Sequence, residues 1–192
     1  MIQQALVGPS VPRRGNALLR ALGTAVLALL GWRIVGEIPD RRKMVIAVAP
    51  HTSNWDFVVG AATMFAVDLD ASFLGKHTLF RGPFGPPMRW IGGIAVDRSS
   101  AHGVVGDAIA AFESSDARVL AIAPQGTRSP VARFRSGFLN IARGARVPIV
   151  LAALDYEARR VRFGPLLEPA EDGEAQLAEI ERHFSTVRGR NR

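Results

Sequence analysis

The sequence contains no cysteine, which excludes disulfide bonds, a thiolate nucleophile and cysteine-ligated metal sites. Histidine is scarce too: there are four, and none lies in the His-Glu-x-x-His pattern of zinc hydrolases. We therefore expect no metal ion to take part in the chemistry. Long apolar runs are also missing, since the longest apolar core, Ala21 to Trp32, has about a dozen residues, whereas a membrane-spanning helix takes roughly 20.

Acidic residues are outnumbered. The chain has 24 Lys and Arg against 17 Asp and Glu, with a formal charge of +7 and a pI near 11.2. The excess is almost wholly arginine, because lysine occurs only at positions 43 and 76. Arginine binds phosphate through forked hydrogen bonds, so we expect a phosphate-bearing partner such as a lipid headgroup or coenzyme A. Nucleic acid is disfavoured, because the arginines are scattered and no binding module is recognised.

The first 36 residues differ from the rest of what we expect to be one domain. Residues 1–16 are rich in Pro, Gly and Arg and are expected to be mobile. Residues 17–35 are apolar around two arginines and favour an amphipathic, interfacial helix at a membrane surface, where arginine side chains reach the headgroups. A signal peptide and a helix packed on the domain's own core are the alternatives. Residues 37–192 are expected to form the folded domain, with its motifs in residues 44–156.

Short apolar runs alternate with helical patterns along this domain. The alternation predicts an α/β fold in which helices flank a mixed or mostly parallel sheet. Residues 82–88 carry three prolines and two glycines and are predicted to be irregular. The predicted strands are residues 44–49, 71–74, 94–96, 119–123 and 147–154, and the predicted helices are residues 57–69, 104–113, 138–143 and 173–188.

The stretch from Val48 to Phe57 places a histidine, a hydroxyl cluster and an aspartate directly after the first predicted strand. A helical pattern follows, so these residues lie at a strand-to-helix turn with Ser53 or Asn54 as the cap. Proteins of the α/β class place their chemistry at this edge of the sheet. His51 and Asp56 are close enough for the carboxylate to bind one imidazole nitrogen, which would leave the other free as a general base.

Two further loops follow predicted strands, at residues 97–98 and 125–129. If the strands share one sheet, these loops meet at the edge that carries the histidine. An arginine in each loop would then hold a phosphate, and a glycine in the second would let the backbone approach the ligand. A lysine follows the second predicted strand. The candidate substrate-binding residues are Lys76, Arg98, Gly126, Thr127 and Arg128.

Four blocks, in this order, resemble those of the phospholipid/glycerol acyltransferase family, whose lysophosphatidate acyltransferases move a fatty acyl group from a thioester to a glycerol hydroxyl. His51 to Asp56 is similar to the catalytic His-x4-Asp of that family. Residues 93–98 resemble the second block, whose arginine is implicated in acceptor binding. Residues 124–129 resemble the block that binds the acceptor phosphate, which adds Gln125 to the candidate site, and residues 147–150 resemble the fourth block.

The resemblance implies an O-acyltransferase of phospholipid biosynthesis, with 1-acyl-sn-glycerol-3-phosphate as the expected acceptor. His51 would deprotonate the acceptor hydroxyl, which attacks the thioester of acyl-CoA or of an acyl carrier protein without a covalent acyl-enzyme. No cofactor is implied beyond this co-substrate. The expected partners are the acyl donor, the lysophospholipid and a membrane, to whose cytoplasmic face the protein would bind peripherally or monotopically.

One residue departs from the family pattern: Gln125 stands where the family usually has Glu. Glutamine keeps the size and one acceptor oxygen but loses the negative charge. The acceptor headgroup therefore stays open, and an amino-lipid or a glycolipid is the alternative acceptor. A lipid-binding relative without catalysis is a further alternative, against which the His51–Asp56 pair argues.

Overall fold

A single sheet of eight strands runs through the centre of the protein, whose computed structural model describes residues 6–96, 101–127 and 133–191. The strand order is β1-β2-β8-β7-β3-β6-β4-β5, and every neighbouring pair is parallel except the antiparallel pair β7–β8. The predicted mostly parallel α/β sheet is therefore confirmed. The strands are β1 (Leu6–Val7), β2 (Arg33–Ile38), β3 (Lys43–Ala49), β4 (Ala71–Lys76), β5 (Gly93–Val96), β6 (Arg118–Ile122), β7 (Ile149–Asp155) and β8 (Arg160–Leu167).

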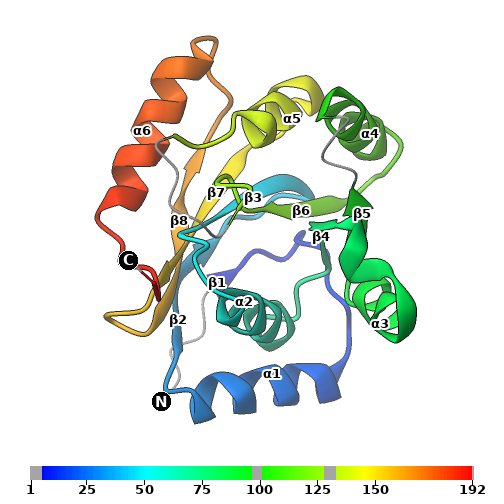
Figure 1. Cartoon of the computed structure of the whole chain (residues 1–192), viewed down its shortest axis with the longest axis vertical. Helices are drawn as coiled ribbons and strands as arrows, with labels where there is room; N and C mark the ends of the chain where they lie inside the picture. The colour runs from blue at the N-terminus through cyan, green and yellow to red at the C-terminus, as the bar shows by residue number, and fades with distance from the viewer. Residues whose placement is uncertain (1–5, 97–100, 128–132, 192) are drawn as a thin grey trace.

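Helices cover both faces of this sheet (Figure 1). On one face α2 lies on the sheet and α1 lies outside α2, while α4, α5 and α6 cover the other face. The helix α3 lies at the far edge, beside β5. The helices are α1 (Ala17–Leu29), α2 (Trp55–Ala66), α3 (Gly85–Trp90), α4 (Ala101–Glu113), α5 (Gly137–Ala145) and α6 (Gly173–Ser185), with 3-10 turns η1 (His77–Phe80) and η2 (Gly82–Phe84).

The strand β3 lies between β7 and β6 and is buried on both faces. Successive side chains of a strand point to opposite faces. Met44 and Ile46 accordingly pack with α2, whereas Val45 and Ala47 pack with α4, α5 and α6. This double burial explains why the run carries no polar residue after Lys43, and it fixes the end of β3 firmly in the centre of the sheet edge.

The prediction that residues 82–88 are irregular is wrong. They form η2 and the first part of α3. Pro86 and Pro87 lie in the first turn of α3, where the backbone N–H groups have no partner within the helix. The two prolines therefore remove no hydrogen bond, and their fixed φ suits a helix start.

The N-terminal segment is also different from the expectation. The helix predicted over residues 17–35 ends at Leu29, and Gly31 follows with a φ of +72°, a conformation that commonly ends helices. The chain then enters β2, which pairs with β8, a strand that the sequence did not predict. The expected domain boundary after residue 36 falls inside β2. Residues 6–16, expected to be mobile, include β1, which pairs with β2.

The helix α1 has two apolar faces. Its inner face packs against α2 through Gly23 and Leu27, and a Cβ at Gly23 would lie 2.5 Å from the carbonyl oxygen of Ala62. Its outer face exposes an apolar stripe made of Leu18, Leu22, Ala25 and Leu29. Membrane binding by this stripe stays a prediction. Over residues 6–96, 101–127 and 133–191, no helix has the length and hydropathy that crossing a bilayer requires.

Candidate active site

The predicted site residues meet at one edge of the sheet. Because β3, β4 and β6 are parallel neighbours, their carboxyl ends lie together. His51 follows β3, Lys76 ends β4 and the loop 125–127 follows β6. Of the three loops predicted to converge, the His51 turn and residues 125–127 lie together at this edge, and Lys76 ends the neighbouring strand there. Arg98 and Arg128 lie outside the residues that the structure describes.

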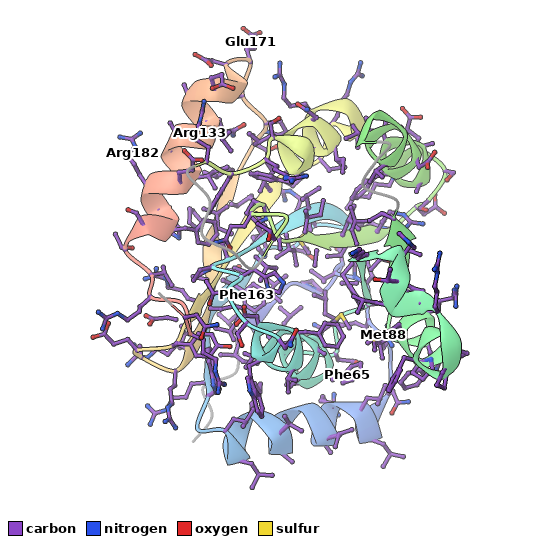
Figure 2. All side chains as sticks on the ribbon, viewed as in Figure 1. Phe65, Met88, Arg133, Phe163, Glu171 and Arg182 are labelled. Carbon is purple, nitrogen blue, oxygen red and sulfur yellow. The ribbon has the colours of Figure 1, made fainter. Side chains whose placement is uncertain are left out.

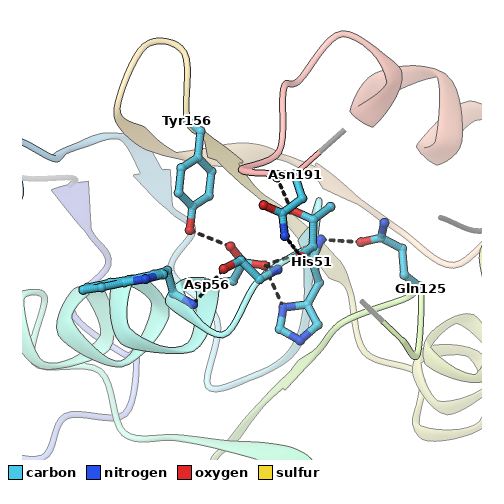
Figure 3. A network of polar contacts seen from close by, with 8 residues as sticks. His51, Asp56, Gln125, Tyr156 and Asn191 are labelled. Atoms are coloured by element: carbon cyan, nitrogen blue, oxygen red, sulfur yellow. Dashed lines mark hydrogen bonds and ion pairs between the residues drawn. The ribbon is translucent and has the colours of Figure 1, made fainter. Parts of the chain in front are cut away.

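His51 and Asp56 form the predicted pair. His51 Nδ1 lies 3.2 Å from Asp56 Oδ2, and the Asp56 side chain is almost fully buried while that of His51 is about one quarter exposed. A carboxylate only accepts hydrogen bonds, so Nδ1 carries a proton, and in the neutral imidazole the lone pair is on Nε2. Figure 3 shows the imidazole with its far edge directed away from Asp56. The geometry is that of an oriented general base.

Asp56 also organises the turn itself, residues 50–56, which we call the catalytic turn. Its Oδ2 accepts hydrogen bonds from the backbone N–H groups of Thr52 at 2.6 Å and Ser53 at 2.7 Å. Ser53 Oγ in turn accepts from the N–H of Trp55 at 3.2 Å, whereas the side chain of Asn54 does not cap α2. Of the two predicted caps, Ser53 is therefore the one that bonds to the helix start.

Tyr156 is the third member of the network and was missed by the sequence reasoning. Its hydroxyl donates a hydrogen bond to Asp56 Oδ1 at 2.6 Å (Figure 3). Tyr156 directly follows β7, which is parallel to β3, so it reaches the same sheet edge as His51. Its ring packs edge-on against Trp32, with 4.8 Å between the ring centroids. The only signal in the sequence was its position two residues after a predicted strand.

The protonation states of this pair follow from their surroundings. Burial alone would raise the pKa of Asp56, but hydrogen bonds from His51, Tyr156, Ser53 and Thr52 outweigh it and hold the pKa below its usual value. Burial and then the Asp56 carboxylate raise the pKa of Tyr156 far above its usual value. Asp56 is therefore ionised and Tyr156 is a hydrogen-bond donor at neutral pH.

Gln125 supports the catalytic turn from the side of β6. Its side-chain oxygen accepts a hydrogen bond from the backbone N–H of His51, and the residue is 8% exposed. The sequence placed Gln125 among the substrate-binding residues. In the structure, its oxygen acts on the histidine backbone, which makes Gln125 a positioning residue for His51.

Arg135 is a cation that the sequence reasoning also missed. Gly126 has a φ of +66°, and a Cβ there would lie 2.9 Å from the Cδ and Nε atoms of Arg135. Arg135 therefore lies against the glycine, on the side where a side chain would otherwise project. Its backbone N–H donates to the carbonyl oxygen of Pro124 at 2.8 Å, which joins residue 135 to the loop that also carries Gln125.

The C-terminal residues return to the catalytic turn. Asn191 Nδ2 donates to the carbonyl oxygen of Thr52 at 2.8 Å (Figure 3), and the guanidinium carbon of Arg190 lies 5.0 Å from the ring centre of Trp55. The turn is thus held by β6, by the end of β7 and by the C-terminal segment. No local pattern in the sequence could reveal a contact between residues 139 positions apart.

A cavity of about 1450 Å³ opens beside His51. Three cations among the described residues line it, namely Lys76, Arg81 and Arg135, whereas its one carboxylate is the hydrogen-bonded Asp56. The rest of the wall is mainly apolar, and Figure 2 shows Met88 and Phe163, two of the lining residues, on separate parts of the fold. In such a cavity a base can take a hydroxyl proton, the cations can bind an anionic group, and the apolar wall can pack against a hydrocarbon chain.

Comparisons with known proteins agree with this arrangement. A model of the acyltransferase family matches residues 33–154, from the start of β2 to the last residue but one of β7, with the catalytic turn inside the matched segment. Among solved structures, PlsC from Thermotoga maritima, a 1-acyl-sn-glycerophosphate (LPA) acyltransferase, has a similar fold. The TM-score is 0.61 and the sequence identity 17%, over 88% of this chain and 76% of that chain. No curated protein sequence matches significantly. Tyr156 lies just beyond the matched segment.

Proposed function

The chain belongs to the acyltransferase family, and from this premise we propose that it transfers a fatty acyl group from a thioester to the hydroxyl of a lysophospholipid at a membrane surface. It is an acyltransferase, and the proposal concerns its substrates. The expected acceptor is 1-acyl-sn-glycerol-3-phosphate, and the expected donor is acyl-CoA or an acyl carrier protein. The observation that carries the proposal is Nε2 of His51, which has no hydrogen-bond partner among the described residues and lies beside a cavity that is both cationic and apolar.

The chemistry follows from the His51–Asp56 pair. Nε2 of His51 takes the proton of the acceptor hydroxyl while the hydroxyl oxygen attacks the thioester carbon. The resulting tetrahedral oxyanion collapses and the carbon–sulfur bond breaks. The imidazolium gives its proton to the departing sulfur, which leaves as a thiol. The buried, ionised Asp56 stabilises the imidazolium between these two steps. No residue of the chain becomes acylated.

The apolar wall of the cavity suits the acyl chain. Ile46, Leu154 and Phe163 come from the sheet and Met64 comes from α2, so this wall lies between the helix and the sheet. Burying a hydrocarbon chain there contributes roughly 0.8 kcal/mol for each methylene removed from water. That binding energy favours long-chain over short-chain donors.

The cationic part of the cavity suits an anionic acceptor headgroup. Lys76, Arg81 and Arg135 line it with no carboxylate within ion-pair distance of any of them among the described residues. An Arg side chain binds phosphate through two parallel hydrogen bonds, which favours a phosphate-bearing lysolipid. Gln125 stands where the family pattern has Glu, and this departure keeps an amino-lipid or glycolipid acceptor as the second candidate.

The test is a product analysis. The wild-type protein is incubated with labelled long-chain acyl-CoA and, in separate reactions, with lysophosphatidate, lysolipids of other headgroups, an amino-lipid and a glycolipid. Thin-layer separation should show labelled product, most of it from lysophosphatidate. Product from the amino-lipid or glycolipid alone would replace the proposed acceptor by the second candidate. With acyl carrier protein as the alternative donor included, no product in any reaction would favour a non-catalytic lipid-binding protein.

A further inference from the structure

A second surface of the protein has the composition of a lipid-binding surface. Residues 76–94, which we call the cavity rim, run from the end of β4 through η1, η2 and α3 into β5. They contain Lys76, Arg81 and Arg89 but no Asp or Glu. Four large apolar side chains of the rim are exposed: Leu79 by 47%, Phe84 by 71%, Trp90 by 61% and Ile94 by 39%.

These side chains are left outside a segment that already has its own packing. Phe80 is the buried residue of η1, and Gly85 and Gly93 lie directly against its backbone and ring. Arg89 Nη1 donates to the carbonyl oxygen of Phe80 at 3.4 Å, and its guanidinium carbon lies 5.6 Å from the ring centre. The rim is therefore a packed unit around Phe80. Single exposed apolar residues are ordinary on protein surfaces, but four on adjoining short elements call for a partner.

The charges of the rim point to an anionic partner. Within residues 6–96, 101–127 and 133–191, neither Lys76, Arg81 nor Arg89 has a carboxylate within ion-pair distance. Aromatic side chains combined with arginine and lysine are typical of protein surfaces that enter the boundary between headgroups and acyl chains. Anionic lipids attract each cation near the surface by about 1 kcal/mol.

The rim is continuous with the catalytic cavity. Leu79, Arg81, Phe84 and Met88 line the same cavity as His51. A lipid that leaves a bilayer held against the rim would therefore enter the cavity without its acyl chain crossing water. The backbone of Trp90 also accepts a hydrogen bond from Arg14 Nη1 at 3.4 Å, which joins the rim to the residues just before α1.

We propose that the cavity rim binds the surface of an anionic bilayer, with Phe84 and Trp90 inserted at the headgroup level and the rim cations against lipid phosphates. The inference rests on the proposed function only in that the substrates are lipids. It differs from the membrane contact expected of α1, because it places a membrane-binding surface at the mouth of the cavity.

Tryptophan fluorescence tests this directly. The chain has three Trp residues: Trp32 is buried, whereas Trp55 and Trp90 are exposed. The probe is vesicles of phosphatidylcholine and phosphatidylglycerol whose acyl chains carry bromine, which quenches tryptophan only at close range. Quenching should persist in Trp55→Phe and should be lost in Trp90→Phe. Quenching that is lost in Trp55→Phe but kept in Trp90→Phe would overturn the proposal.

Vesicle partitioning gives the second measurement. The double variant Phe84→Ser with Trp90→Ser should partition to these vesicles roughly tenfold more weakly or worse, because two apolar insertions are lost. Binding of the wild type should weaken in salt and on pure phosphatidylcholine vesicles. Leu18→Ser with Leu29→Ser on the outer face of α1 is the matched control. If the rim variant partitions like the wild type and the α1 variant loses vesicle binding, the membrane contact belongs to α1 alone and the proposal that the rim binds a bilayer is wrong.

Turnover separates this inference from the proposed function. Trp90 does not line the cavity, so Trp90→Ser should retain wild-type acyl transfer between a short-chain thioester and a water-soluble acceptor. The same variant should lose activity on vesicle-borne acceptor. If Trp90 is quenched but the wild type transfers no acyl group, the proposed function is refuted and the proposal that the rim binds a bilayer stands. If Trp90→Ser impaired transfer only from an acyl carrier protein, with normal vesicle binding, the partner of the rim would be the carrier protein and the lipid assignment would be wrong.

Discussion

The catalytic turn and the cavity rim lie at the same edge of the sheet and are built in opposite ways. In the turn, the oxygens of Asp56 are occupied by four donors and the carboxylate is buried. In the rim, cations have no carboxylate partner among the described residues, and large apolar side chains are exposed. The difference fits a division of labour between the two proposals. The atoms proposed to move a proton are fixed before substrate arrives, whereas the atoms proposed to meet the lipid are left open to it.

Loss of the Asp56 charge should cause a large defect within the turn. Asp56→Asn keeps the shape and can still accept from the backbone amides, but it no longer stabilises an imidazolium at His51. We expect kcat to fall on the order of 10²–10⁴-fold with little change in KM. Steady-state kinetics on the best acceptor would check this. A change in KM alone would mean that Asp56 acts on substrate binding rather than on the base.

Loss of the Tyr156 hydroxyl should have a smaller effect, because it acts on His51 only through Asp56. Tyr156→Phe keeps the ring against Trp32 and removes one hydrogen bond to the carboxylate. We expect kcat to fall roughly 10–100-fold, since hydrogen bonds to charged groups contribute about 1.5–3 kcal/mol. The pKa of Asp56, followed by carbon NMR of its carboxyl, should rise towards its usual value. An unchanged pKa of Asp56 would reduce Tyr156 to a packing role.

Two variants of Gln125 test how much its side chain contributes to positioning the catalytic turn. Gln125→Glu keeps an oxygen that can accept from the His51 N–H, whereas Gln125→Ala removes it. We expect Gln125→Ala to lower kcat several-fold, on the order of 1 kcal/mol for one lost hydrogen bond, and Gln125→Glu to retain most of the wild-type rate. If the acceptor profile changes in Gln125→Glu while kcat is kept, residue 125 also selects the headgroup.

The smallest effect is expected in the pH dependence of the free energy of unfolding. The pKa of Asp56 is lower in the folded protein than its usual value of 3.8. A lowered pKa means that the stabilisation is complete above the unfolded-state pKa and is lost as the pH falls through the folded-state pKa. Denaturant unfolding should therefore show wild type more stable than Asp56→Asn at neutral pH, with the gap narrowing below about pH 4. A gap that is constant with pH would mean that ionisation of Asp56 does not contribute to stability.

The sequence predicts the elements with strong local patterns. The buried run of β3 and the polar cluster after it predict both the strand and the His51–Asp56 turn, because an apolar run and a helix start have few other interpretations. The four-block resemblance predicts the family, which the family model confirms over residues 33–154. These features depend on residues that are close together in the chain.

The missed features depend on position in the fold. The strand β8 begins with the alternation of charged and apolar residues that is typical of a strand, but Gly164 and Pro165 interrupt the pattern and conceal the strand in the sequence. The prolines of α3 predict a break until their place in its first turn is known. Tyr156 carries no local motif, and only the order of the strands brings it to the catalytic turn. Arg135 carries no local motif either, and its contact with Pro124 forms within the connection between β6 and α5.

Whether His51 is the general base of acyl transfer is tested most directly by single-turnover transfer of a labelled acyl group from acyl-CoA to the best acceptor. The comparison is between the wild type and His51→Ala, with circular dichroism to show that the variant is folded and vesicle binding to show that the rim is intact. We predict that the rate constant for transfer falls roughly 10²–10⁴-fold while vesicle binding is unchanged. Transfer by folded His51→Ala within a few-fold of the wild-type rate would contradict the account.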